Sequence, residues 1–336
     1  MRFDYRRELA GGAVLTVFDH ESELLQGNPL GDPHVRAQPV LVPAGGGAGL
    51  PLVTVLVGYT GFNHKVLNKG SMWGETLPER FARLMASGAI PPAVFLWPAC
   101  ETRLGGSQYV DSPGTGPYMS YLLDEVVPAA EAEFGCGGEG RRVVAGKSSG
   151  GYGALTLAMR RPGYFRAVAS HAGDMGFDMS HFRGFADALN CWAKYGGPEA
   201  FVAKLAELEN FGFMEHAGIE GIAMASCYSP NPDAPLGVDL PVVPETGEIR
   251  EEVFARWLKH DPLRMVEESE HAEALRNLDV LYLDAGERDE FALQWGLKRM
   301  AKRLGELGIP AEVQYFPGGH FAMDDRYEVS LPQLLG

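Results

Sequence analysis

The sequence predicts an α/β protein whose mostly parallel, twisted sheet carries helices on both faces. Short apolar segments of strand length alternate along the chain with longer segments of helical periodicity. The strand segments are apolar throughout, which is typical of strands buried on both faces, and parallel neighbours need a helical crossover between them. These observations together favour a sheet sandwiched between two helix layers.

The predicted strands are short runs rich in β-branched residues. Two of them, at 14–18 and 39–42, have no helix between them, so we expect the sheet to begin with antiparallel strands. The remaining strands are expected at 52–57, 93–97, 142–145, 167–170, 280–283 and 312–316. Helices are expected at 75–87, 118–134, 152–160 and 291–307, with a short one after Asp324.

A segment of about 100 residues, 174–277, interrupts this alternation. It is helical around 197–210 and 248–260 and rich in proline over 228–247. We therefore predict one domain, residues 1–336, with a cap-like insertion at about 174–277 before the penultimate strand. Its aromatic residues allow two interpretations. Phe177 and Trp192 could line a substrate pocket beneath a lid, or they could form the core of the insertion itself.

Composition limits the partners of this protein. Its 336 residues hold 29 Lys+Arg and 44 Asp+Glu, so the formal net charge is 29 − 44 = −15. A polyanion without a dense basic patch is repelled by nucleic acid and by anionic membranes. No signal peptide or membrane span is apparent, and the four cysteines are widely spaced, so we expect a cytoplasmic protein with free thiols. Neither a metal site nor a cofactor is predicted, since the chain lacks H-E-x-x-H and its histidines do not cluster.

The motif that indicates chemistry is Gly146-Lys147-Ser148-Ser149-Gly150, which fits G-x-S-x-G. In this pattern a serine stands on a sharp turn between strand and helix, and the glycines let the backbone make that turn. The free N–H groups and the positive dipole of the helix N-terminus suit an oxygen that becomes negative. A phosphate-binding loop is excluded because its first glycine position holds Arg141. Ser148 is thus the predicted nucleophile.

A serine nucleophile needs a general base, which a carboxylate orients, in the chain order Ser, Asp/Glu, His. Of the histidines downstream, His320 is favoured because its glycine loop follows the last strand directly. Asp284, Glu287 and Asp289 compete as the acid. Asp289 is favoured since it lies past Gly286 and before a helix, although it could also cap that helix.

Two backbone N–H groups should then bind the oxyanion, one from the residue after the nucleophile and one from the loop after the third strand. These are the N–H groups of Ser149 and Tyr59, the latter in the loop Gly58-Tyr59-Thr60-Gly61.

At these motifs the chain resembles the esterase D and S-formylglutathione hydrolase-like "putative esterase" family of the α/β-hydrolase superfamily. The run GKSSGGYGAL from Gly146 is similar to the GHSMGGHGAL of S-formylglutathione hydrolases, and LDAGERDEFAL from Leu283 is similar to the family's D-x-G-x-x-D-x-F-L segment, whose second Asp corresponds to Asp289. The loop 57–63 resembles the family's G-L-T loop, with Tyr59 in place of Leu. Similarity continues through GGSQYVDSPGTGPY at 105–118 and the helix around 124–128, and it covers 14–173 and 280–321.

The resemblance implies the α/β-hydrolase fold and a serine esterase that acts on a small-molecule ester. The same Ser148, His320 and Asp289 would equally serve an acyltransferase or a thioesterase, so these remain alternatives. Lys147 replaces the usual His before the nucleophile, and Cys100 lies where many relatives have Asp. These departures prevent assignment of a particular substrate, and a homodimer is left open.

Overall fold

The computed structural model describes residues 5–69 and 71–336. Among them, nine strands form one twisted sheet in the order β1-β2-β3-β5-β4-β8-β9-β10-β11. Pairing is antiparallel from β1 to β5 and parallel from β5 to β11, which confirms the antiparallel start. The strands are β1 (Arg6–Glu8), β2 (Val14–Glu21), β3 (Val35–Val42), β4 (Leu52–Leu56), β5 (Val94–Leu96), β8 (Arg142–Lys147), β9 (Ala167–His171), β10 (Val280–Gly286) and β11 (Glu312–Phe316).

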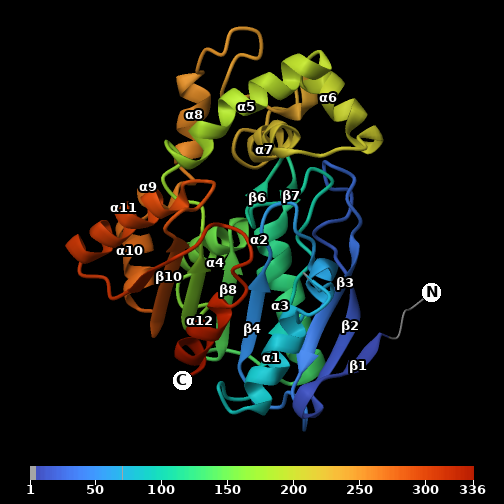
Figure 1. Cartoon of the computed structure of the whole chain (residues 1–336), viewed down its shortest axis with the longest axis vertical. Coiled ribbons are helices and arrows are strands. Elements are labelled where there is room, and N and C mark those ends of the chain that lie inside the picture. Colours follow the sequence, from blue (N-terminus) through green and yellow to red (C-terminus); the bar gives the residue numbers. More distant parts are fainter. Residues whose placement is uncertain (1–4, 70) are drawn as a thin grey trace.

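Helices cover both faces of this sheet (Figure 1). On one face lie α1 (Leu77–Ala86) and α12 (Arg326–Leu335), which pack with Val53 and Val55 of β4 in one core. The other face carries α3, α4, α10 and α11 and buries Leu52 and Leu56 of the same strand. Because side chains alternate along a strand, one apolar strand supplies both cores. Their bounds are α3 (Val127–Phe134), α4 (Ser149–Arg160), α10 (Ser269–Arg276) and α11 (Leu293–Glu306).

Residues 118–134, expected as one helix, form α2 (Tyr118–Ser120), a π-helical turn (Tyr121–Val126) and α3. The hairpin β6 (Asp111–Ser112) and β7 (Gly116–Pro117) precedes them. Short 3₁₀ turns occupy Ala10–Gly12, Asn63–Leu67, Leu205–Glu207 and Pro235–Gly237. The fold is the expected α/β-hydrolase arrangement.

Helices α5 (Ser180–Tyr195), α6 (Pro198–Lys204), α7 (Phe213–Tyr228) and α8 (Glu251–Leu258) form the insertion, above one end of the sheet in Figure 1. They share a separate apolar core. The last part of the predicted insertion behaves differently, because α9 (Pro262–Met265) and α10 join the core beneath α4. Apolar residues such as Val266 and Leu275 face the sheet layer there. The separately packed segment therefore ends before α9.

All four cysteines are free and buried, as expected. Within the described residues, no helix is both long and apolar enough to cross a membrane.

Candidate active site

Ser148 stands at the sharp turn between β8 and α4. Its backbone has φ 59° and ψ −126°, a conformation that costs energy for a residue with a side chain. A side chain at Gly146 would collide with the backbone of Gly150, and one at Gly150 would collide with Leu56. The glycines of the motif are therefore needed because the start of α4 lies directly against the strands. Such a strained, tightly supported turn is the geometry expected of an exposed nucleophile.

A cavity of about 500 Å³ opens above Ser148. It lies at the carboxyl ends of the parallel strands, where ligands bind in open α/β sheets. Its walls include four of the residues predicted for the site, namely Tyr59, Ser148, Ser149 and His320. Residues as far apart in the sequence as Tyr59 and His320 thus line the same cavity. No group of three His, Cys, Asp or Glu suited to hold a metal occurs among the described residues.

His320 and Asp289 are in direct contact. Nδ1 of His320 lies 2.8 Å from Oδ2 of Asp289, and both residues are about 95% buried. The other oxygen, Oδ1, accepts the backbone N–H of Phe291 at 2.9 Å, so Asp289 organises the turn before α11 as well. Orientation by the carboxylate and the local capping role coexist because different oxygens perform them.

Glu290 holds the backbone of the His320 loop. Its Oε2 accepts the His320 N–H at 2.5 Å. Adjacent carboxylates therefore fix the side chain and the main chain of one histidine, and this restricts both the ring and the loop that carries it. No sequence pattern indicates this second contact, which depends on how the glycine loop folds back on residue 290.

Asp284, the competing acid, is occupied elsewhere. It contacts His171 Nδ1 at 2.9 Å, and it accepts hydrogen bonds from Arg326 Nε at 2.8 Å and from the Tyr282 hydroxyl at 3.0 Å. Burial opposes its ionisation, but His171 and Arg326 outweigh burial and hold the pKa of Asp284 below its usual value. Both oxygens of Asp284 are thus occupied by hydrogen bonds to core residues, and neither contacts His320.

Tyr59 and Ser149 line the cavity, and their backbone N–H groups have no protein acceptors among the described residues. Two neighbours brace them. The amide of Gln108 donates to Ser149 Oγ at 2.9 Å, and the hydroxyl of Tyr109 donates to the Val57 carbonyl at 2.7 Å. Gln108 and Tyr109 both have positive φ, near 53°, so a strained backbone segment supplies the contacts to Ser149 and to Val57, two residues before Tyr59.

The Tyr59 loop rests on the segment 99–105. The Tyr59 hydroxyl donates to the Leu104 carbonyl at 2.8 Å, and the Thr60 N–H donates to the Gly105 carbonyl at 3.2 Å. These contacts explain why a tyrosine can replace the leucine of the family motif: its ring packs against the segment, and its hydroxyl is satisfied there.

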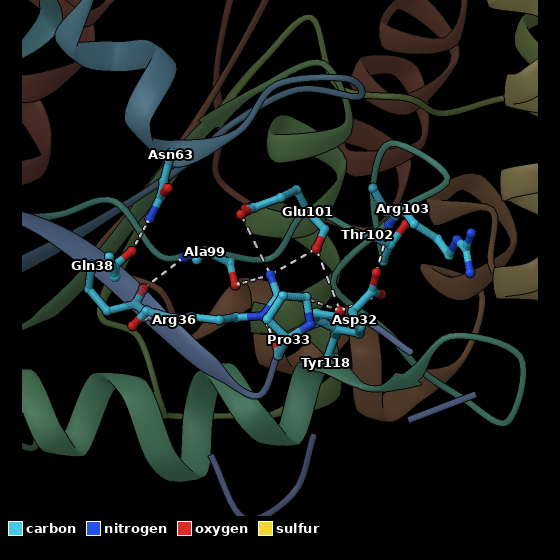
Figure 2. A network of polar contacts seen from close by, with 12 residues as sticks. Asp32, Pro33, Arg36, Gln38, Asn63, Ala99, Glu101, Thr102, Arg103 and Tyr118 are labelled. Carbon is cyan, nitrogen blue, oxygen red and sulfur yellow. Dashed lines mark hydrogen bonds and ion pairs between the residues drawn. The ribbon is translucent and has the colours of Figure 1, made fainter. Parts of the chain in front are cut away.

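Buried Arg36 of β3 anchors this same segment (Figure 2). It donates to the carbonyls of Ala99 and Glu101 at 3.3 and 2.8 Å, and to the Tyr118 hydroxyl at 2.8 Å. Asp32 accepts from that hydroxyl and from the Arg103 N–H, at 3.0 and 2.8 Å. The sequence analysis missed this network because its members are up to 86 residues apart.

Phe177 and Trp192 do not line the cavity, contrary to the pocket-lining interpretation. Phe177 is fully buried against Tyr152 and Tyr228, and the Trp192 indole is buried with its N–H donating to Gly218 at 3.0 Å. They form the core of the insertion, as the second interpretation had it. Besides Tyr59, the aromatic lining comes from residues that were not predicted for the site, namely Phe211, Phe213, Phe291 and Phe321.

The two departures from the family motifs have different surroundings. Lys147 faces the cavity near the Phe321 ring, and burial, partly offset by Asp324 and Asp289, lowers the pKa of its ammonium group. Cys100 is buried beside the Tyr59 loop, and burial raises the pKa of its thiol, so it is an unreactive core residue.

A family model described as "Putative esterase" matches residues 81–333 of the 336. The chain belongs to this family. Membership covers the strand–turn–helix at Ser148 and both other residues of the predicted triad, and it makes the protein a carboxylic ester hydrolase. No curated protein matches the esterase significantly.

Solved structures similar to this esterase share its fold over nearly the whole chain. A ferulic acid esterase has 17% identity and a TM-score of 0.63, covering 96% of this chain and 98% of that one. An S-formylglutathione hydrolase from Agrobacterium tumefaciens has 16% identity and a TM-score of 0.58, with 99% of both chains covered. A fluorophosphonate-binding serine hydrolase from Staphylococcus aureus has 13% identity and a TM-score of 0.59, covering 96% and 99%. At these identities the likeness concerns the fold.

Proposed function

We propose that this esterase hydrolyses small to medium carboxylic esters through Ser148, His320 and Asp289, without a cofactor. The observation that carries the proposal is the 2.8 Å contact between His320 and Asp289 at the wall of the cavity into which the strained Ser148 turn projects. An imidazole held by a carboxylate is the base that a serine hydroxyl needs near neutral pH.

In the proposed reaction, Ser148 Oγ attacks the ester carbonyl while His320 takes its proton. The carbonyl oxygen becomes negative, and the N–H groups of Tyr59 and Ser149 stabilise it. His320 then protonates the departing alcohol, leaving an acyl group on Ser148. Water, activated by His320, releases the acid. Asp289 holds the ring and stabilises its charged form throughout.

Covalent labelling tests the nucleophile directly. A fluorophosphonate probe should add to the Ser148 peptide, as located by mass spectrometry, and should abolish hydrolysis of p-nitrophenyl acetate in proportion to labelling. Ser148→Ala should remove the label, whereas Ser330→Ala, a control in the core, should keep it. Labelling of another residue, or hydrolysis that survives complete labelling, would contradict the proposal.

Transfer of the acyl group to an alcohol would use the same acyl-enzyme. Product analysis in the presence of added methanol measures how water and alcohol partition. We expect free acid to be the main product, and a predominant methyl ester would assign the protein as an acyltransferase instead.

A further inference from the structure

A second, smaller cavity adjoins the main one beneath the insertion. It encloses about 120 Å³ beside helices α5 and α7. The two cavities share several lining residues, which are Asp174, Phe213, His216, Glu220 and Phe291. Because these walls are common, a group in the side cavity would belong to a molecule whose ester lies at Ser148. Its volume suits a substituent of a few heavy atoms.

Asp174 is the carboxylate shared by both cavities. Within the described residues, its side chain accepts no hydrogen bond, although burial, with Glu220 nearby and against the effect of His181, raises its pKa to about 6. Asp174 is partly exposed to the cavities, and a carboxylate there without a protein donor gains most from a ligand that brings N–H groups.

The other polar groups of the side cavity reinforce this preference. Glu220 lies 3.7 Å from His181 Nδ1 and 3.5 Å from His216 Nδ1. The His181 ring is 95% buried, and its Nε2 has no partner in the described part of the chain. Despite its burial, contact with Glu220 raises the pKa of His181. The histidines thus contact Glu220 directly, whereas His181 acts on Asp174 through its charge, with no hydrogen bond or ion-pair contact between the two among the described residues.

Charge is separated along the two cavities. Lys65 and Lys147 line the main cavity but not the smaller one. The side cavity adds the carboxylates Asp187 and Glu290 and one arginine, Arg183, whose guanidinium donates to the Glu290 carbonyl at 3.0 Å. An anion is therefore disfavoured at this end of the site.

Aromatic rings complete the walls, from Phe185, Phe213, Trp257 and Phe291. The faces of aromatic rings attract cations, particularly alkylated ammonium groups, in addition to burying their carbon atoms. A carboxylate beside several aromatic rings is a combination that suits an amine better than a neutral alkyl group.

We propose that the side cavity binds a protonated amine on the substrate, with Asp174 as its main partner, so that this enzyme prefers esters carrying a short aminoalkyl arm. This inference rests on the proposed function, since the ester of the same molecule would lie at Ser148.

Matched pairs of esters test the proposal. One pair, 2-(dimethylamino)ethyl acetate and 3-methylbutyl acetate, places the amine on the alcohol. The other, methyl 4-(dimethylamino)butanoate and methyl 5-methylhexanoate, places it on the acid. The members of each pair have the same shape and differ in charge at pH 7.5. We expect the wild type to show kcat/KM about 10- to 100-fold higher for the amine in at least one pair, as for a hydrogen bond to a charged group.

Asp174→Asn should reduce that preference at least about tenfold, because the amide keeps the shape and removes the charge. Asp187→Asn is the matched control, since Asp187 lies at the exposed rim of the same cavity and should change the preference less than about threefold. Asp174→Ser repeats the measurement if the Asn variant does not fold.

Equal rates within both pairs, or a preference that survives loss of the Asp174 carboxylate, would overturn the inference. Hydrolysis of the neutral esters that depends on Ser148 would still support the proposed function in that case. Absence of any Ser148-dependent hydrolysis would count against both.

Discussion

Two buried histidine–aspartate pairs occur in this molecule, and the contact within each pair is nearly the same. At the cavity, His320 lies 2.8 Å from Asp289, and in the core His171 lies 2.9 Å from Asp284. The core set is the more complete of the two as a chain of hydrogen bonds, since His171 Nε2 also lies 3.0 Å from Ser330 Oγ. Contact geometry alone therefore does not identify an active site.

The residues at the cavity and those in the core differ in solvent access and in the backbone strain of the serine. The three core residues, Ser330, His171 and Asp284, are each at most 1% exposed. Ser330 lies in the regular helix α12, whereas Ser148 occupies a strained turn that opens to a cavity of about 500 Å³. The Ser330 hydroxyl can only form a hydrogen bond with His171. The Ser148 hydroxyl can instead reach the carbonyl of a substrate in the cavity, beside backbone N–H groups that have no protein acceptor.

The carboxylates differ in the same way. The two carboxylate oxygens of Asp284 contact His171, Arg326 and Tyr282, and these buried contacts stabilise the fold. Asp289 directs one oxygen to His320 and the other to the backbone. The contacts of Asp284 hold core groups together, whereas those of Asp289 leave the other ring nitrogen of His320 available on the cavity side.

The largest expected effect comes from exchanging the two serines for alanine. Ser148→Ala should lower kcat for p-nitrophenyl acetate by a factor on the order of 10⁵–10⁶, as when a serine nucleophile is removed. Ser330→Ala should keep kcat within about twofold and instead reduce the free energy of unfolding by about 1–3 kcal/mol, because buried His171 Nε2 loses its partner. Steady-state kinetics and urea unfolding measure both, and a comparable loss of kcat in the two variants would refute the distinction.

Amidation of the two carboxylates should give the next largest contrast. Asp289→Asn should lower kcat about 10³- to 10⁴-fold with little change in KM, since the imidazole loses the group that orients it and stabilises its charge. Asp284→Asn should leave kcat of the folded fraction nearly unchanged and lower the free energy of unfolding by about 3 kcal/mol, because Arg326 and His171 lose a buried partner. A large loss of kcat in Asp284→Asn, with only a loss of stability in Asp289→Asn, would show that Asp284 is the functional acid.

Sequence reasoning succeeded where the signal is local. Apolar strands at 52–57 and 142–145 and the glycines around Ser148 are features of single short segments, and β4, β8 and the turn to α4 follow them. The preference for Asp289 over Asp284 as the acid also rests on a local feature, since Asp289 follows the glycine that lets the chain turn away from the strand, and its catalytic role stays a prediction. The structure places Asp289, and not Asp284, against His320.

The insertion was harder to predict because its helices lack the usual polar face. Helix α7 is buried along most of its length, so its sequence shows no apolar stripe that marks it as helical. Aromatic residues there could line a pocket or fill a core, and the choice depends on packing that no periodicity encodes. Arg36 illustrates the same limit, since it contacts residues 63 to 82 positions away.

The smallest expected effect concerns how the stability of the fold falls at acid pH, which should reveal the charge of Asp284 in the core. His171 and Arg326, acting against burial, hold the pKa of Asp284 below 3.8, its ordinary value. A lowered pKa in the folded state contributes stability that is complete above the unfolded-state pKa and is lost as the pH falls through the folded-state pKa. The wild type should therefore lose Tm more steeply than Asp284→Asn between pH 5 and pH 3, as followed by circular dichroism. All other carboxylates titrate in both proteins, so the difference in slope isolates Asp284, and parallel slopes would mean that this carboxylate is not held in its charged form by the core.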